Sequence, residues 1–261
     1  MNPHIKTIVK LLESCRYRHD VYTVFSDCME TMAIACSNAV DHSQFAKREA
    51  RYLEIVSRYD SDVLATFPKV LAEVTMAMQT EPGDVLGTVF GELEVNNTAR
   101  GQFFTPFELC RLMARFQIGD GAEARAIIAH EGYVSASEPA CGAGALIIAL
   151  AEAMRDAGIN YQRHLHVVAV DVDPRAAHMA YVQFTLLHIP AVVIVGNTLA
   201  MEEREHLYTP AHVLGGWSGR LAARKARDSA AASPQQTVIA PALPSPAGNP
   251  RHGQTDQLTL F

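Results

Sequence analysis

The sequence contains no apolar run that could cross a membrane. Its longest run, ALIIALA at 145–151, is far shorter than the roughly 20 residues that a spanning helix needs. The opening stretch, MNPHIKTIVKLLES, has no apolar core of the kind that signal peptides carry. The five cysteines are odd in number, irregularly spaced and without a CxxC pair, which argues against a disulfide framework or a zinc site. We therefore expect a cytoplasmic protein with free thiols, no bound metal and no membrane partner.

An excess of positive charge is also lacking. Lys and Arg number 22 against 28 Asp and Glu, which gives a formal net charge of −6. Proteins that bind nucleic acid tightly by themselves are more often basic, so such contact would need a local patch or a partner. The one basic run, within 220–227, we interpret as the solvated face of a helix in preference to a DNA-binding surface.

Residues 1–100 have the pattern of a helical region. Ile5, Ile8 and Leu12 recur at helical spacing, and DVLGTVFGELE at 84–94 predicts a further amphipathic helix. Residues 229–261 form a tail rich in Pro, Ala, Ser and Gln up to about Asp256, and we expect it to be disordered because it cannot bury enough apolar area to offset its ordering entropy.

Residues 101–228 have the sequence pattern of an α/β domain. Strands are predicted at 133–137, 165–173 and 191–197, and the segments between them predict helices. This alternation implies parallel strands with right-handed crossovers, as in half of a doubly wound sheet. Beyond 197 the strand signal fades, and we expect TLAMEEREHL at 198–207 to be helical.

The stretch TPFELCRLMARF at 105–116 predicts a capped helix. Thr105 is expected as the N-cap, Pro106 at the first helical position and Glu108 three residues after the cap, which would make a capping box. Four apolar residues of this helix fall on one face, which we expect to pack: Leu109, Leu112, Met113 and Phe116.

EPACGAG at 138–144 lies where the first strand of this domain turns into a helix. Gly142 and Gly144 would let the backbone approach a ligand closely, and the helix start offers N–H groups. Asp171 ends the second strand, where a carboxylate can accept both hydroxyls of a ribose. This spacing suits an adenosine-containing cofactor. NAD is disfavoured because Pro139 and Ala140 stand where the first glycine of its fingerprint belongs.

Several motifs together resemble the N6-adenine DNA methylases, and above all the modification subunits of type I restriction systems. The likeness covers about 84–200, through DVLGTVFGELEVNNTARGQFFTPFELCRLM, EPACGAGALIIALAEAM, VVAVDVDPRAAHMAYVQFTLL and VGNTL. GQFFTP followed by PACGAG is the specific part, since two distant motifs must coincide. The resemblance implies an α/β fold in which an N-terminal helical region precedes a partial, Rossmann-like parallel sheet that binds S-adenosylmethionine.

The resemblance also implies which residues hold the cofactor. The FTP motif and the glycine loop would lie at its methionine end, and Asp171 at its ribose. Asn197 stands where the family usually has an aspartate near the adenine ring, and Glu138 replaces another common aspartate. The cofactor-binding residues so implied are Gln102, Phe103, Phe104, Thr105, Pro106, Pro139, Ala140, Cys141, Gly142, Ala143, Gly144, Asp171 and Asn197.

The family's catalytic loop, Asn/Asp-Pro-Pro-aromatic after a fourth strand, has no counterpart in 198–261. TPAH at 209–212 and NPRH at 249–252 are the nearest matches, and neither has two prolines and an aromatic residue. We therefore assign no catalytic residue. In the family the fourth strand pairs beside the first, so we expect residues 207–225, with Trp217 as a packing anchor, or else another protein, to cover that edge.

The chain ends in QLTLF, which resembles the peptide by which bacterial proteins bind the sliding clamp. Gln257 would bond at the pocket rim, and Leu258, Leu260 and Phe261 would fill an apolar groove. The alternative is that these residues pack back on the body of the protein.

Two main functions remain open from the sequence. The first is a DNA adenine-N6 methyltransferase of the restriction-modification class that uses S-adenosylmethionine and contacts DNA through a partner subunit. The second is an inactive, cofactor-binding regulatory subunit recruited to the clamp. A helical interaction protein with a vestigial sheet is a third reading.

Overall fold

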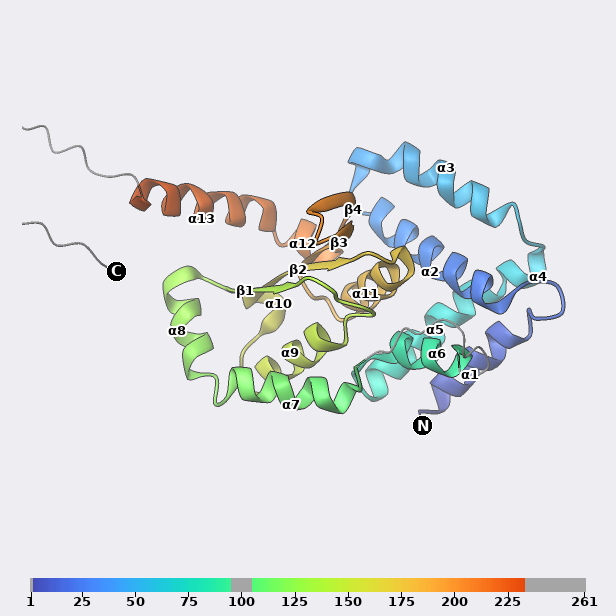
Figure 1. Ribbon diagram of the computed structural model, residues 1–261, viewed down its shortest axis with the longest axis horizontal. Coiled ribbons are helices and arrows are strands. Elements are labelled where there is room, and N and C mark those ends of the chain that lie inside the picture. The colour runs from blue at the N-terminus through green and yellow to red at the C-terminus, as the bar shows by residue number, and fades with distance from the viewer. Residues whose placement is uncertain (1, 95–104, 233–261) are drawn as a thin grey trace, which may run out of the picture.

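The computed structural model describes residues 2–94 and 105–232, and Figure 1 shows their arrangement. Among these residues, no helix combines the length and apolarity that crossing a membrane requires. The predicted sites at Gln102, Phe103 and Phe104, and at Gln257, Leu258, Leu260 and Phe261, lie outside the described residues.

The N-terminal region is helical, as predicted. Its first helix shows why: Asn2 accepts a hydrogen bond from the His4 N–H as the cap, and Ile5, Ile8 and Leu12 bury one face. The elements are α1 (Pro3–Glu13), α2 (Val21–Asn38), the 3-10 turn η1 (His42–Gln44), α3 (Phe45–Val56), α4 (Ser61–Leu64), α5 (Thr66–Thr80) and α6 (Val85–Glu94).

The second half alternates helices and strands. The elements are α7 (Phe107–Ile118), α8 (Ala122–Glu131), β1 (Val134–Glu138), α9 (Ala145–Asp156), α10 (Tyr161–His164), β2 (Leu165–Asp171), α11 (Pro174–Leu186), β3 (Ala191–Asn197), β4 (Glu202–Tyr208), α12 (Pro210–Leu214) and α13 (Trp217–Ala232). Helix α13 therefore continues through 229–232, which the composition had assigned to the tail.

The described strands form one sheet in the order β1-β2-β3-β4. The pairs β1/β2 and β2/β3 are parallel, with Val134 beside Leu165 and Val167 beside Ala191, which confirms the predicted parallel core. The fourth strand corrects the prediction. Residues expected to be helical form β4, which runs antiparallel to β3, so the sheet is mixed.

Strand β4 carries little apolar signal because it is an edge strand. Glu202, Glu203 and Arg204 are exposed, and only Leu207 is fully buried among its residues. The ladder to β3 supplies the backbone hydrogen bonds that hold the segment, and helix-favouring Glu and Arg side chains do not prevent it. Local composition therefore predicted the wrong element.

One continuous core joins the helical region to the sheet. Helix α2 packs on α11 and α7 on α9, and the fully buried side chains of this core include Phe25, Phe90, Ile148 and Phe184. Cores of this kind are close-packed, so the helices and the sheet support one another mechanically.

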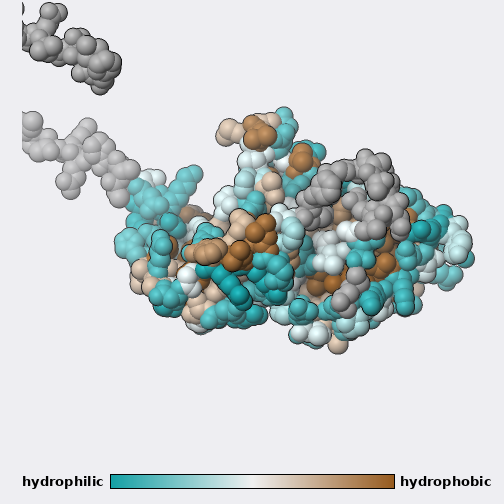
Figure 2. All heavy atoms as spheres, turned by 60° about the horizontal axis from the view of Figure 1, so that its bottom comes forward, coloured by the Kyte–Doolittle hydropathy of each residue, from teal (hydrophilic) through white to brown (hydrophobic). Residues whose placement is uncertain are grey.

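The prediction of which face of α7 packs against the protein is also wrong. Its buried residues are Cys110, Ala114 and Ile118, while the four-residue face expected to pack is exposed, with Phe116 at 79%. Figure 2, in which the bottom of Figure 1 turns forward, shows apolar residues gathered at the surface over α7. The helix is amphipathic in sequence, yet it turns its small residues toward α9, which packs closely against it.

The first strand has no strand partner on its outer side among the described residues, and residues 207–225 reach it as predicted. The Trp217 ring packs edge-on against Tyr133, just before β1, with centroids 5.1 Å apart. The Arg224 guanidinium donates to the Ser135 hydroxyl at 3.4 Å. Trp217 is 1% exposed, which confirms that it is a packing anchor.

Candidate cofactor pocket

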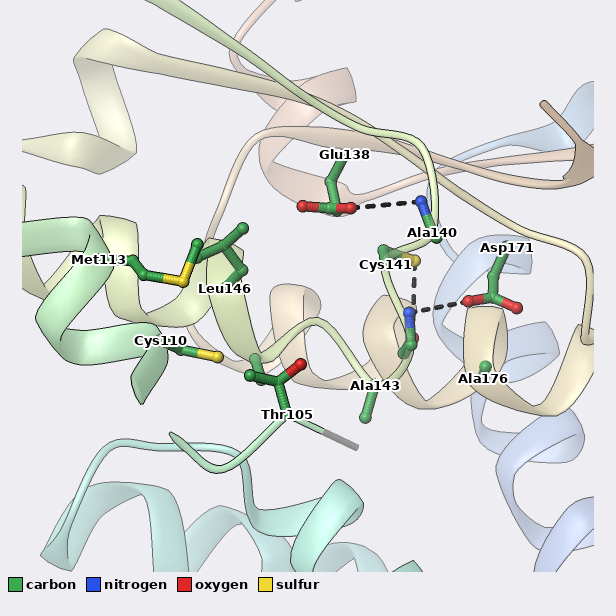
Figure 3. Close-up of a pocket in the computed structure, with 12 residues that line it drawn as sticks. Thr105, Cys110, Met113, Glu138, Ala140, Cys141, Ala143, Leu146, Asp171 and Ala176 are labelled. Atoms are coloured by element: carbon green, nitrogen blue, oxygen red, sulfur yellow. Dashed lines mark hydrogen bonds between the residues drawn. The ribbon is translucent and has the colours of Figure 1, made fainter. Parts of the chain in front are cut away.

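A cavity of about 370 Å³ opens at the carboxyl ends of β1 and β2. Its volume falls within the range of about 300–1,000 Å³ that small-molecule sites occupy. One wall comes from α7 and the segment before it, and the opposite wall from the strand ends and the β1–α9 loop. Figure 3 shows Cys110 and Met113 on the α7 side, with Cys141 and Asp171 across from them.

The β1–α9 loop is shaped by two glycines in left-handed backbone conformations. Gly142 has φ of 54° and Gly144 of 94°. A Cβ on Gly144 would stand 2.5 Å from the Phe184 ring, so no side chain fits there. The Cys141 N–H donates to the Val170 carbonyl at 2.8 Å, which pins the loop to β2. The sequence predicted a close backbone approach to a ligand at both glycines; Gly142 lines the cavity, whereas Gly144 lies against Phe184 in the core.

Asp171 joins the end of β2 to this loop. Its Oδ2 accepts from the Gly142 N–H at 2.8 Å, and its Oδ1 accepts from the Asp173 N–H at 2.9 Å. A carboxylate has about four acceptor sites, so both oxygens keep capacity for ligand hydroxyls. Asp173 accepts from the Arg175 N–H at 3.0 Å and caps α11.

Glu138 places a second carboxylate at the cavity. It ends β1, lines the cavity with Asp171, and accepts from the Ala140 N–H at 3.2 Å. Two carboxylates beside an otherwise apolar wall favour a ligand that carries hydroxyl or amino donors. The sequence singled Glu138 out only as a replacement for the more usual aspartate.

The other predicted loop residues fall into two groups. Ala140, Cys141, Gly142 and Ala143 line the cavity, together with Asp171. Pro139 and Gly144 shape the loop without lining it, and the Pro139 carbonyl accepts from the Thr198 hydroxyl at 2.8 Å. That bond ties the loop after β3 to the loop after β1.

Asn197 lies at the end of β3 and does not line the cavity. Its Oδ1 accepts from the N–H groups of Leu199 and Ala200, at 3.0 and 3.2 Å. The side chain thus stabilises its own turn, and the structure does not bring it to Asp171's cavity.

Thr105 lines the cavity, while Pro106 does not. The predicted capping box is wrong. Helix α7 begins at Phe107 with Pro106 as N-cap, and no side chain caps it. Pro106 has ψ of 132°, which is not helical, so Thr105 lies one residue before the cap position. Glu108 instead forms an ion pair with Arg111 at 3.1 Å.

The sequence missed part of the cavity wall. Cys110 and Met113 lie three residues apart on α7 and so share one side of the helix, but no sequence signal distinguished them from ordinary packing residues. Leu146 and Ala176, at the starts of α9 and α11, complete this apolar part of the wall. Burial raises the pKa of the Cys110 and Cys141 thiols, which disfavours the reactive thiolate. Both side chains therefore serve as apolar parts of the cavity wall and not as nucleophiles.

These residues fit an adenosine-containing cofactor. Gly142 presents backbone without a side chain to the cavity, the carboxylates can accept from ribose hydroxyls, and the methionine and leucine side chains offer apolar contact. The first N–H groups of α9 have no partner inside the helix, and no acidic residue occupies its first turn, so this end can receive a carboxylate.

The basic run of α13 is engaged within the protein. The Arg220 guanidinium lies 3.7 Å from the centre of the Trp217 ring, and Arg224 and Arg227 form ion pairs with Glu131. The ion pairs fasten α13 to α8, and the bond from Arg224 to Ser135 fastens it to β1. They favour the structural interpretation of the run over a DNA-binding surface.

Comparison with known proteins gives one family match. The model of the family described as N-6 DNA Methylase matches residues 83–215, about half of the chain. A crystal structure described as a class I S-adenosylmethionine-dependent methyltransferase of Listeria monocytogenes resembles this chain, with a TM-score of 0.42 and 13% identity. The match covers 74% of this chain and 53% of that one, so this chain spans about half of its length. No curated protein matches.

Proposed function

The chain belongs to the N-6 DNA methylase family, and we propose that it binds S-adenosylmethionine. We propose further that, together with a partner subunit, it takes part in the transfer of a methyl group to the N6 of adenine in DNA. The observation that carries this proposal is the hydrogen bond between Asp171 and Gly142, which holds an acceptor carboxylate and the glycine-containing loop together at one cavity.

Asp171 and Glu138 would hold the polar part of the cofactor. Asp171 keeps acceptor capacity for the ribose hydroxyls, and Glu138 lines the same cavity. Met113 and Leu146 would contact the apolar part, and the start of α9 would receive the carboxylate. When bound, the cofactor supplies a methyl group on a positively charged sulfur, and the protein's task is to orient that group and exclude water.

Residues 198–261 contain no Asn-Pro-Pro-aromatic motif that could hold the adenine. The nearest sequence match, TPAH at 209–212, forms the start of α12, where Thr209 is the cap. His212 there is 2% exposed, and its Nδ1 lies 3.0 Å from the Nε2 of His166, so this segment does not serve the cavity. We infer that a partner provides the acceptors that hold the amino group and flip the base.

Calorimetric titration of S-adenosylmethionine into the purified protein tests the proposal, with Asp171→Ala beside it. We expect the wild type to bind and the variant to lose at least about tenfold in affinity, since it loses a charged acceptor. Asp171→Asn serves as the control, because it retains an acceptor for the Gly142 N–H. No binding by the folded wild type would reject the cofactor site in this chain.

The second candidate function is a regulatory subunit without transferase activity. The absence of an Asn-Pro-Pro-aromatic loop from 198–261 favours it. Transfer of a labelled methyl group to adenine-containing DNA separates the two functions. If the protein binds the cofactor but transfers no methyl group, either alone or with the other subunits of its native complex, its function is regulatory.

We further propose that QLTLF at the end of the chain recruits the protein to a bacterial sliding clamp. Recruitment would raise the effective concentration near DNA, which an acidic chain otherwise lacks. Fluorescence polarisation of the labelled peptide with a bacterial clamp tests this. We expect binding that replacement of Gln257 and Phe261 by alanine removes. Equal binding of both peptides would reject the clamp motif.

A further inference from the structure

Gln183 joins three separate parts of the molecule through one buried amide. It lies on α11 and is 0% exposed. Its Nε2 donates to the Ala143 carbonyl at 2.7 Å and to the Asp84 Oδ1 at 2.9 Å. Its Oε1 accepts from the Leu86 N–H at 3.0 Å. The orientation of the amide follows from these partners, because the reverse would set its oxygen against two acceptors.

Asp84, which accepts from the Gln183 amide, is itself held in place by its neighbours. It precedes α6 and is 8% exposed, and its Oδ1 also accepts from the Gly87 N–H at 2.9 Å. A Cβ at Gly87 would stand 2.1 Å from the Asp84 Oδ2, so only glycine leaves room for this carboxylate. Burial raises the pKa of Asp84. A buried carboxyl of this kind depends on its hydrogen bonds.

Ala143 is the part of the β1–α9 loop that Gln183 holds. It lines the cavity and stands between Gly142 and Gly144, both of which have positive φ. Glycine adopts positive and negative φ at similar free energy, so the backbone of the loop has little intrinsic preference for its observed shape. The Gln183 amide bonds the carbonyl at its centre directly.

We propose that Gln183 is a positioning residue for the cofactor loop, and that through Asp84 it couples cofactor binding to the packing of the N-terminal helices. The identity of the ligand rests on the proposed function, while the positioning of the loop does not. Loss of the amide frees the Ala143 carbonyl and the Asp84 carboxyl together, so the loop and α6 loosen as a unit.

The central variant is Gln183→Met, which keeps the length of the side chain and removes its hydrogen bonds. Thr209→Val is the matched control. Thr209 is also 0% exposed, and its hydroxyl donates to the Ile189 carbonyl at 2.9 Å and accepts from the Ala191 N–H at 2.9 Å. Thr209 is the N-cap of α12 and lies beside Ala191, where β3 starts, at the opposite end of the strands from the cavity.

The first measurement is alkylation of cysteines in the protein without cofactor, followed by mass spectrometry. Cys141 lies in the loop and is 7% exposed, and Cys28 lies in the helical core at 0%. The ratio of their rates separates loop opening from global unfolding. We expect Gln183→Met to raise this ratio about tenfold, the effect of losing a buried hydrogen bond, and Thr209→Val to leave it within about twofold.

The second measurement is the affinity for S-adenosylmethionine. We expect about tenfold weaker binding by Gln183→Met and unchanged binding by Thr209→Val at a similar loss of Tm. If the two variants change the Cys141/Cys28 ratio equally, Gln183 is merely structural and the proposal is overturned. If the wild type binds no cofactor, the proposed function fails, and the alkylation ratio still decides the positioning role.

Asp84 provides a second pair of variants should Gln183→Met not fold. Asp84→Asn keeps an oxygen for Gly87 and Gln183, and we expect its Cys141/Cys28 ratio to match the wild type within about twofold. Asp84→Ala removes that acceptor, and we expect the ratio to rise about tenfold. Equal ratios in Asp84→Asn and Asp84→Ala would overturn the coupling to α6.

Discussion

The Asp171 carboxylate and the Gly142 N–H are hydrogen bonded at 2.8 Å, so the second strand directly fixes the loop that follows the first. The residue that would receive a ribose also shapes the loop beside it, and its removal should therefore affect stability as well as binding.

Asp171→Ala should destabilise the protein without cofactor by about 1–3 kcal/mol, because the N–H groups of Gly142 and Asp173 lose their acceptor. Asp171→Asn should cost about half as much, because its single amide oxygen can serve only one of the two N–H groups. Urea unfolding measures both. Equal losses in the two variants would show that these N–H groups do not depend on the side chain.

Gly144→Ala should be much more costly than Gly158→Ala. Both glycines have positive φ, 94° and 74°, so both variants suffer backbone strain of about 1–2 kcal/mol. Only at Gly144 would the added Cβ meet the Phe184 ring, at 2.5 Å, which adds about 1–3 kcal/mol. The difference between the free energies of unfolding isolates the clash, and similar losses would contradict this account of the loop.

Phe116→Ala should change the free energy of unfolding by less than about 0.5 kcal/mol, because the side chain is 79% exposed. Ile118→Ala, two residues on in the same helix and 8% exposed, should cost about 2–5 kcal/mol. Denaturant titration of both variants checks which face of α7 packs. A large loss at Phe116 would restore the face that the sequence predicted.

The protein should lose stability as the pH falls below about 6.5. Burial, and then the charges of His212 and Arg220, lower the pKa of His166 from 6.5 to about 4. The unfolded chain therefore binds a proton through this range that the folded protein does not, at a cost of about 1.4 kcal/mol per pH unit. Burial also lowers the pKa of His212, which acts in the same direction.

Urea unfolding at pH 7.5 and 5.0 tests the role of His166. The wild type should lose about 2 kcal/mol from this group over the interval. His166→Gln, whose amide can still bond His212, should lose correspondingly less. The same pH dependence in both proteins would assign the effect to other groups.

Much of the fold was predictable because its signals are local. Pro174 and the Asp173 cap mark the start of α11, and the buried strand 165–171 precedes them. The spacing of Gly142, Gly144 and Asp171 likewise placed the loop and the carboxylate at one cavity. The fold class, a helical region before a partial methyltransferase-type sheet, followed from those signals and from the family motifs.

The failures come from tertiary structure overriding local pattern. The exposed face of α7 is apolar in sequence, but α9 selects the opposite face, which carries Cys110 and Ala114, for close packing. Strand β4 has a composition that favours helix, and its pairing with β3 decides its form. Thr105 fails as a cap because Pro106 has ψ of 132° and stays outside the helix, which begins one residue later than the motif predicts.

The Gln183 contact also sets an order of events during synthesis. Asp84 and Gln183 are 99 positions apart, so the carboxyl leaves the ribosome well before its partner does. Until α11 follows, Asp84 must stay hydrated and the Ala143 carbonyl has no amide to hold it. We expect a nascent chain halted before residue 183 to expose Cys141 to alkylation. The pocket would then become competent for a ligand only late in translation, after most of the helical region has already been made.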